Sequence, residues 1–273
     1  MAAAEAIDDT DEESSLEVDG SEYAGMSATD LNNLGGMSLK GGDMSAAILA
    51  YQAAMMQYPD DPVAYYNMGY IFINYLADTT NGVPLLEKVV ELDSENTDAW
   101  FYLGTAYVLI DEKEKAYYAF QNALDVNPLN DAAWYFLGMM AEALGDIDEA
   151  LECFEEALLI NPDNPLVHQS KGVLFSTHGE HEKALESLSK ADPESLIAQF
   201  YIGASNLELG NSDSALKSFQ KVTKMEPQDS LEEGLITTSL HNIDVIQSAA
   251  KKTGTAVRTN QISKSVFSQT DLQ

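Results

Sequence analysis

The chain has 273 residues, with 45 Asp and Glu against 14 Lys and Arg, and its formal net charge is −31. This imbalance argues against nucleic-acid binding and against attraction to anionic membranes, because both need basic patches. The hydrophobic content of 45% is enough for a folded core, yet no apolar run reaches the ~18 residues that would favour direct membrane insertion.

Residues 1–27 contain nine acidic residues and no basic one, without an apolar period. This composition predicts a disordered acidic tail. The segment also lacks the positive charge and apolar stretch of a secretory signal. Because Cys153 is the single cysteine, an internal disulfide is excluded, and a cytoplasmic setting is expected.

A fixed spacing appears after residue 97. Trp100 and Trp134 are 34 residues apart, and six further pairs of identical residue type keep that offset: Gly104/Gly138, Leu103/Leu137, Ala116/Ala150, Phe120/Phe154, Ala123/Ala157 and Pro128/Pro162. A period of this length indicates stacked supersecondary units, each too small to bury its own apolar face.

The pattern resembles the tetratricopeptide repeat (TPR), a helix–turn–helix unit of 34 residues. WFYLGTAY at 100–107 matches the signature of the first helix, and WYFLGMMA at 134–141 matches it again, with Ala141 where the family usually has tyrosine. The resemblance implies an all-α fold, a right-handed α-α superhelix (TPR solenoid) with the first helix of each unit lining the inner surface.

Phasing the pattern outward predicts six repeats, a capping helix over 230–252 and a polar, disordered tail over 253–273. The predicted repeats are 28–61, 62–96, 97–130, 131–164, 165–195 and 196–229. Two of them are irregular. In 62–96, Pro84 predicts a second helix that begins late and is short. In 165–195, Asp192-Pro193 comes three residues early, which removes nearly one turn. Both irregularities are interpreted as neutral loop drift or as a widening of the groove.

One stripe of the first helices is unusually aromatic and apolar for a solvent-facing surface. In the family this stripe faces the concave groove, so the resemblance implies a peptide-binding groove there. The alternative is that these side chains pack between successive helices. The candidate groove residues are Tyr66, Tyr70, Ile73, Asn74, Phe101, Thr105, Val108, Tyr135, Met139 and Phe200.

Acidic residues form a second stripe, on one face of the helix that begins after Asp146. Glu149, Glu152 and Glu156 lie on it, and Asp148 comes just before. Three interpretations remain open: a solvated convex face, a docking surface for a basic partner, or adaptation to a high-salt cytoplasm.

Catalytic and metal-binding patterns are missing from the sequence. His178 and His181 are spaced i, i+3 but lack a cysteine or another histidine nearby, and are interpreted as exposed turn residues. His168 takes the place of Trp100 in its own repeat and is expected to pack. Cys153 is expected to be an inert buried thiol. No enzyme activity, cofactor or metal is therefore predicted.

The resulting functional prediction is a protein–protein interaction scaffold or chaperone-like adaptor. It would bind an apolar or amphipathic segment of a partner, basic in charge, in the groove. The alternative is a self-assembling structural or coat protein built from stacked repeats.

Overall fold

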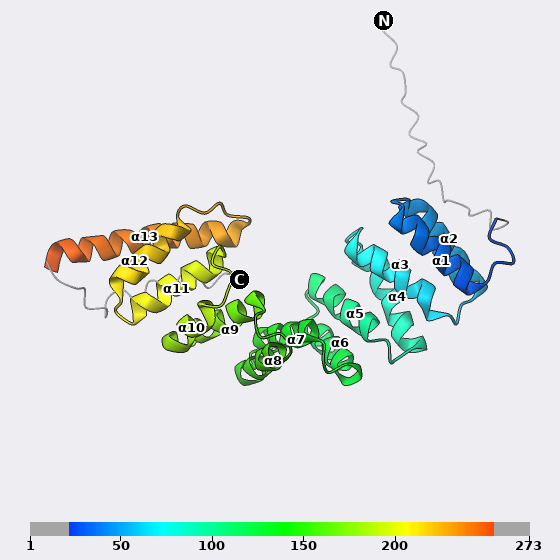
Figure 1. Ribbon diagram of the computed structural model, residues 1–273, viewed down its shortest axis with the longest axis horizontal. Coiled ribbons are helices and arrows are strands. Elements are labelled where there is room, and N and C mark those ends of the chain that lie inside the picture. Colours follow the sequence, from blue (N-terminus) through cyan, green and yellow to red (C-terminus); the bar gives the residue numbers. More distant parts are fainter. Residues whose placement is uncertain (1–21, 254–273) are drawn as a thin grey trace, which may run out of the picture. The chain divides into compact units, whose positions relative to one another are not determined.

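The computed structural model describes residues 22–253, which contain thirteen α-helices and no strand. The predicted tails at 1–21 and 254–273 lie outside the described residues. The helices are α1 (Ala28–Lys40), α2 (Met44–Gln57), α3 (Pro62–Asn74), α4 (Thr79–Leu92), α5 (Thr97–Leu109), α6 (Lys113–Val126), α7 (Asp131–Leu144), α8 (Ile147–Ile160), α9 (Pro165–Thr177), α10 (His181–Leu188), α11 (Leu196–Glu208), α12 (Ser212–Val222) and α13 (Ser230–Thr253) (Figure 1).

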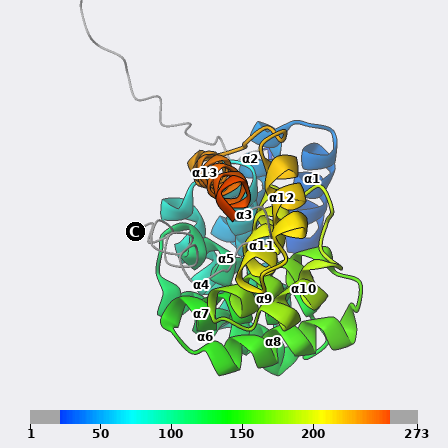
Figure 2. The ribbon, with the colours of Figure 1, turned by 90° about the vertical axis from the view of Figure 1, so that its left-hand side faces the viewer.

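These helices divide into two compact units at Ala106–Tyr107, within α5. In the first unit, α1 packs on α2 and α3 packs on α4, with α2 also against α3. In the second unit, α7/α8, α9/α10 and α11/α12 form the same kind of pair, and α6 packs on α7. The last helix, α13, lies beside α12 (Figures 1 and 2) and also touches α11.

A glycine in the first helix of a pair lets the second helix approach closely. A Cβ atom at Gly138 would lie 2.8 Å from Cε1 of Phe154, and one at Gly172 would lie 2.5 Å from Cγ of Leu188. In both pairs the two residues are 16 apart. The same 16-residue relation joins Gly35 to Tyr51 and Gly203 to Phe219. This contact is the physical basis of the sequence period, because only a residue without a side chain leaves room for the facing ring or isobutyl group.

A second repeated contact anchors the turn before each of four helices. A side-chain nitrogen lies within hydrogen-bond distance of the backbone carbonyl six residues earlier. The four contacts are Trp100 Nε1 to Ser94 (3.0 Å), Trp134 Nε1 to Pro128 (2.9 Å), His168 Nε2 to Pro162 (2.8 Å) and Gln199 Nε2 to Pro193 (3.1 Å). His168, with 5% of its surface exposed, therefore replaces tryptophan as a buried, hydrogen-bonded packing residue.

The expected late start of the second helix in 62–96 is wrong. Helix α4 begins at Thr79 and runs for 14 residues with Pro84 inside it. Asp78 caps its start by accepting a hydrogen bond from the Asn81 backbone N–H (3.1 Å). Gly82 is buried against α3, where a Cβ would lie 2.5 Å from Cδ1 of Ile73. The Asp78 cap and the packing at this glycine therefore start the helix at Thr79, although Pro84 in its second turn cannot donate an i→i−4 hydrogen bond.

The acidic tail predicted to be disordered over residues 1–27 is too long at its C-terminal end. Residues 22–27 form a turn ahead of α1, and Tyr23 is buried in a cluster with Leu31 and Ala54. The Tyr58 hydroxyl donates a hydrogen bond to the Met26 carbonyl (2.8 Å). These six residues belong to the folded array, because an aromatic side chain that covers α2 offsets the entropy of ordering them.

Helix α10 is only eight residues long, whereas α8 has 14. The Gly172–Leu188 contact keeps the usual 16-residue spacing, so the shortening falls at the end of α10 and leaves the helix crossing unchanged.

Candidate functional site: an acidic cleft and a tyrosine surface

The predicted groove residues of the first unit are partly brought together, by α3 and α5. The ring centroids of Tyr66 and Tyr70 are 6.4 Å apart, and that of Tyr102 lies 6.2 Å and 5.0 Å from them. Tyr75 adds an edge contact with Tyr70 at 5.9 Å. Tyr66, Tyr70, Tyr75 and Tyr102 are called the tyrosine surface below, and Phe101 adjoins it through Tyr102 (5.6 Å).

The tyrosine surface is half-buried, apart from Tyr75, which is 54% exposed. Burial, followed by the negative charge of Asp98, raises the pKa of Tyr66 well above its usual value. Burial and the Tyr70 hydroxyl raise the pKa of Tyr102 in the same direction. The hydroxyls of Tyr66 and Tyr102 therefore stay protonated at neutral pH.

Two predicted groove residues are core residues instead. Ile73 is 5% exposed and faces Gly82 of α4, because a stripe of i, i+4, i+7 positions drifts around the helix toward its partner. Phe200 is 1% exposed, in a cluster with Leu235 and Ile246 of α13. The last helix therefore covers a position that would be open at a free end, and neither residue can contact a ligand.

The remaining predicted positions are partly or fully exposed. Asn74 is exposed and donates a hydrogen bond to the Tyr70 carbonyl (3.2 Å), and the Thr105 hydroxyl donates to the Tyr102 carbonyl (2.8 Å). Val108 is half-buried. Tyr135 and Met139 are half-buried in the second unit, where they pack on the cluster around Phe154.

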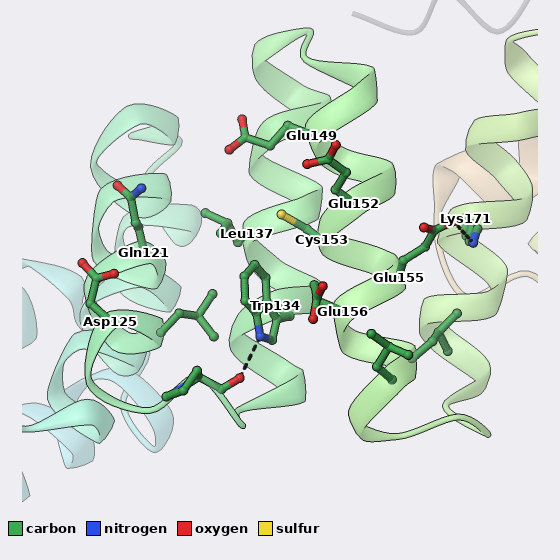
Figure 3. Close-up of a pocket in the computed structure, with 14 residues that line it drawn as sticks. Gln121, Asp125, Trp134, Leu137, Glu149, Glu152, Cys153, Glu155, Glu156 and Lys171 are labelled. Atoms are coloured by element: carbon green, nitrogen blue, oxygen red, sulfur yellow. Dashed lines mark hydrogen bonds and ion pairs between the residues drawn. The ribbon is translucent and has the colours of Figure 1, made fainter.

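A large concavity lies in the second unit, across α6, α7 and α8 (Figure 3). It has a volume of about 840 Å³ and is called the acidic cleft. Its lining residues are Gln121, Leu124, Asp125, Pro128, Trp134, Leu137, Glu149, Glu152, Cys153, Glu155, Glu156, Leu158, Leu159 and Lys171.

The floor of the acidic cleft is apolar. Leu124, Leu137 and Cys153 are buried, and the half-buried indole of Trp134 lines the same cleft, held by its hydrogen bond to the Pro128 carbonyl. Burial, followed by the charges of Glu149 and its neighbours, raises the pKa of Cys153 to about 12. The thiol therefore stays protonated and unreactive at neutral pH, as a small apolar part of the floor.

The rim is formed by five carboxylates: Asp125, Glu149, Glu152, Glu155 and Glu156. Glu149 accepts a short hydrogen bond from the Tyr117 hydroxyl, which raises the pKa of Tyr117 to about 12. Glu155 pairs with Lys171, its Oε1 lying 2.8 Å from the ammonium. The other three carboxylates form no ion pair with any residue that the structure describes, so the rim carries a strong negative potential.

Comparison with protein families identifies the repeats. The tetratricopeptide repeat family matches residues 132–164 and again residues 172–230. The chain is a tetratricopeptide repeat protein. Its helical pairs, their glycine contacts and the absence of strands among the described residues agree with this all-α solenoid fold.

Solved structures share this repeat fold, and one curated protein is similar to part of the chain in sequence. The chain is similar to the crystal structure of MamA, at 28% identity and a TM-score of 0.55, over 57% of this chain and 91% of that one. It also resembles YrrB, described as a TPR protein with an unusual peptide-binding site, at 22% identity and a TM-score of 0.59, over 70% of this chain and 96% of YrrB. The general transcriptional corepressor trfA of Dictyostelium discoideum is 27% identical over 92 residues, which are 34% of this chain and only 6% of that protein.

The described part of this tetratricopeptide repeat protein contains no group of three or more His, Cys, Asp or Glu arranged to hold a metal ion. His178 ends α9, with Nδ1 2.9 Å from the Leu174 carbonyl, and His181 begins α10. None of the helices in the described range is long and apolar enough to cross a membrane.

Sequence reasoning identifies the acids of this tetratricopeptide repeat protein but misses the cleft. The pattern indicates Glu149, Glu152 and Glu156 as one helical stripe, whereas it places Trp134 only in the core. The available signal is the repeat register itself, which puts Asp125 and Trp134 on the two helices that precede this stripe.

Proposed function

We propose that this protein is an interaction scaffold that binds a basic, amphipathic segment of a partner protein in the acidic cleft. Tetratricopeptide repeat proteins bind protein or peptide partners, which supports the general class of function. The observation that carries the proposal is the pairing of an apolar floor at Trp134, Leu137 and Cys153 with five surrounding carboxylates. An apolar side chain fits the floor while flanking Lys or Arg residues meet the rim.

The two parts of the cleft contribute differently to binding. Contact with the Trp134 indole would supply most of the affinity, because large aromatic residues in a concave site act as anchors. The carboxylates would accelerate encounter with a basic segment and reject acidic ones. The net charge of −31 reinforces that steering over longer distances.

Trp134 itself provides the measurement. The chain contains two tryptophans, so Trp100→Phe leaves Trp134 as the only indole reporter in the full-length protein. A short synthetic Leu/Lys peptide should change its fluorescence saturably, and a Leu/Gln peptide should do so far less. Glu152→Gln with Glu156→Gln should weaken Leu/Lys binding roughly fivefold, the effect expected for two partly screened charges.

A matched control tests whether the cleft, rather than net charge, is responsible. Asp213→Asn with Glu233→Gln removes two exposed acids from α12 and α13, also in the second unit but outside the cleft. This variant should bind the Leu/Lys peptide nearly as well as the parent. Equal weakening in both double variants would show that binding reflects only overall charge.

The tyrosine surface is a second candidate contact site for the same function. Tyr75 is 54% exposed, and Asp98 lies close enough to raise the pKa of Tyr66, so an apolar ring and a carboxylate are available together. Tyr66, Tyr70 and Phe101 would then contact an apolar side of the partner, together with Asn74 and Thr105. Calorimetric titration of variants at each surface distinguishes the two sites. Unlike Trp134 fluorescence, calorimetry detects binding at a surface that has no indole nearby.

A further inference from the structure

A second cleft lies next to the acidic cleft, across α8, α9 and α10. Its volume is about 420 Å³, and it is called the lysine cleft because Lys171, Lys183 and Lys190 line it, against two carboxylates, Glu155 and Glu186. Three of the 14 basic residues of the whole chain therefore meet in one cleft. Among the described residues, Lys190 is the lysine of this cleft that forms no ion pair.

The floor of the lysine cleft is formed by Phe175 and His168, both buried. The ammonium groups of Lys171 and Lys183 lie 5.7 Å and 5.3 Å from the centroid of the same Phe175 ring. Each of these two ammonium groups also pairs with a carboxylate, Lys171 with Glu155 and Lys183 with Glu180. A carboxylate of a bound segment would meet Lys190 here, beside the apolar Phe175.

The two clefts are adjacent and share part of their walls. Glu155, Leu158 and Lys171 line both of them, and the 2.8 Å ion pair between Glu155 and Lys171 marks the position where the charge reverses. On one side are Asp125, Glu149, Glu152 and Glu156, and on the other are Lys183 and Lys190 with one carboxylate, Glu186. Since packed helices lie about 8–10 Å apart, the two cleft centres are separated by about one helix spacing.

We propose that the two clefts form one track for a single partner segment with an ordered charge pattern. This inference rests on the proposed function of the acidic cleft. The segment places Lys or Arg at the acidic cleft, an apolar residue against Leu158, and Asp or Glu at the lysine cleft. A separation of about 10 Å corresponds to about three residues of an extended chain or about seven of a helix.

Charge reversal along the track determines which segments bind and in which register. A uniformly basic segment would place a cation beside Lys183 and Lys190, and a uniformly acidic one would face the rim of the acidic cleft. Repulsion at one end therefore rejects both, which is how interfaces gain specificity from unfavourable contacts. A segment with the right charge pattern that is shifted by one helix spacing also places like charges next to each other, and is rejected for the same reason.

The test uses two synthetic peptides that share a Leu/Lys block and differ only in the following block, Glu in one and Gln in the other. Binding is measured by Trp134 fluorescence in the full-length Trp100→Phe protein. In the parent, the Glu peptide should bind at least about threefold more tightly than the Gln peptide. In the double variant Lys183→Gln with Lys190→Gln, the two peptides should bind with equal affinity, because the attraction between the Glu block and these lysines has been removed.

Two further variants make the outcome decisive. Lys183 and Lys190 are exposed, so their replacement should leave the helical circular dichroism unchanged. Lys217→Gln with Lys224→Gln, which removes two exposed lysines elsewhere in the second unit, should keep the advantage of the Glu peptide. Lys183→Glu with Lys190→Glu should reverse it, so that a peptide with Lys in the second block binds best.

The possible failures are distinguishable. One outcome is that both peptides bind, with an affinity ratio that is the same in the parent and in the Lys183/Lys190 variants. In that case the ordered track is wrong, and the proposed function of the acidic cleft is unaffected. If no peptide binds, both proposals fall. If sedimentation shows the parent protein self-associating and the Lys183/Lys190 variants monomeric, the occupant is a second copy of the chain, and the partner-segment proposal is overturned.

Discussion

Lys171 of α9 places its ammonium 2.8 Å from Oε1 of Glu155 on α8, and its side chain is only 16% exposed. The contact joins two successive repeats and separates a cleft rich in carboxylates from one rich in ammonium groups. Because the same pair belongs to both cleft walls, packing between repeats and the charge pattern of the surface are built from the same residues.

Burial predicts that two aromatic residues of one cluster differ in their contribution to stability. Phe154 is fully buried, whereas Trp134 is half-buried on the cleft floor. Phe154→Ala should cost about 3–5 kcal/mol of unfolding free energy, and Trp134→Ala clearly less, since the cost of truncation grows with the size of the cavity left in the core. Urea denaturation measures both. Equal destabilisation would show that Trp134 is a core residue rather than an available cleft residue.

The same cluster predicts a local rather than global effect on stability. Each repeat packs only on its neighbours, so hydrogen exchange in Phe154→Ala should rise most in α7, α8 and the helices next to them. Uniform loss of protection from α1 to α13 would contradict a quasi-one-dimensional array.

Two glycines form a matched pair for testing the helix crossing. Gly138→Ala places a Cβ 2.8 Å from the Phe154 ring and 3.2 Å from the Ala150 carbonyl. We expect a net destabilisation of about 1–3 kcal/mol despite the better helix propensity of alanine. Gly234→Ala in α13 meets nothing within 4 Å and should stabilise by up to about 1 kcal/mol. Thermal unfolding of both variants tests the assignment, and a stable Gly138→Ala would refute the close-approach explanation of the period.

The repeats are predictable from the sequence because this glycine contact leaves a direct trace in the spacing. In 62–96 the corresponding pair is Gly69 and Leu86, where a Cβ would lie 2.8 Å from Cγ, and the separation is 17 rather than 16. The extra residue of this repeat therefore lies between the two packing positions. The role of Gly82 as a second close contact could not be predicted from the sequence, since Asn-Gly usually indicates a turn.

The candidate site is less predictable, for reasons that concern particular residues. Phe200 has the register of an open groove position, but its exposure depends on where α13 lies, which is a contact between distant parts of the chain. Trp134 matches a core signature, yet the apolar floor becomes available only because the neighbouring helices α6 and α8 leave a cleft above it. Local patterns specify which face a side chain is on, but they do not specify what covers that face.

Alkaline pH should lower the free energy of unfolding through ionisation of Cys153. The pKa is raised from 9.0 to about 12 in the folded state, so the unfolded chain loses this proton first. The stabilising contribution is complete below pH ~9 and is lost as the pH rises toward ~12. Compared with the parent, Cys153→Ala should therefore show a smaller fall in unfolding free energy between pH 8 and 10. Parallel curves for the two proteins would mean that the thiol is not desolvated.

Glu142 should oppose stability at neutral pH. Burial raises its pKa, and the nearby charge of His178 only partly offsets this effect. A raised carboxyl pKa contributes stability at acidic pH that is lost as the pH rises through the folded-state value. Glu142→Gln should therefore stabilise the protein at pH 7 relative to the parent, and this advantage should vanish near pH 4. An advantage that is independent of pH would point to packing instead of ionisation.

Calorimetric titration decides between the two candidate surfaces, because it detects binding at either surface without a tryptophan nearby. Tyr70→Ala with Phe101→Ala removes two rings at the tyrosine surface, and Glu152→Gln with Glu156→Gln removes two charges at the acidic cleft. With the Leu/Lys peptide, we expect the first variant to bind within about twofold of the parent and the second to lose roughly fivefold, as expected for charge pairs. A loss above ~2 kcal/mol in the tyrosine variant alone, with unchanged helical circular dichroism, would instead place the anchor residues on α3 and α5.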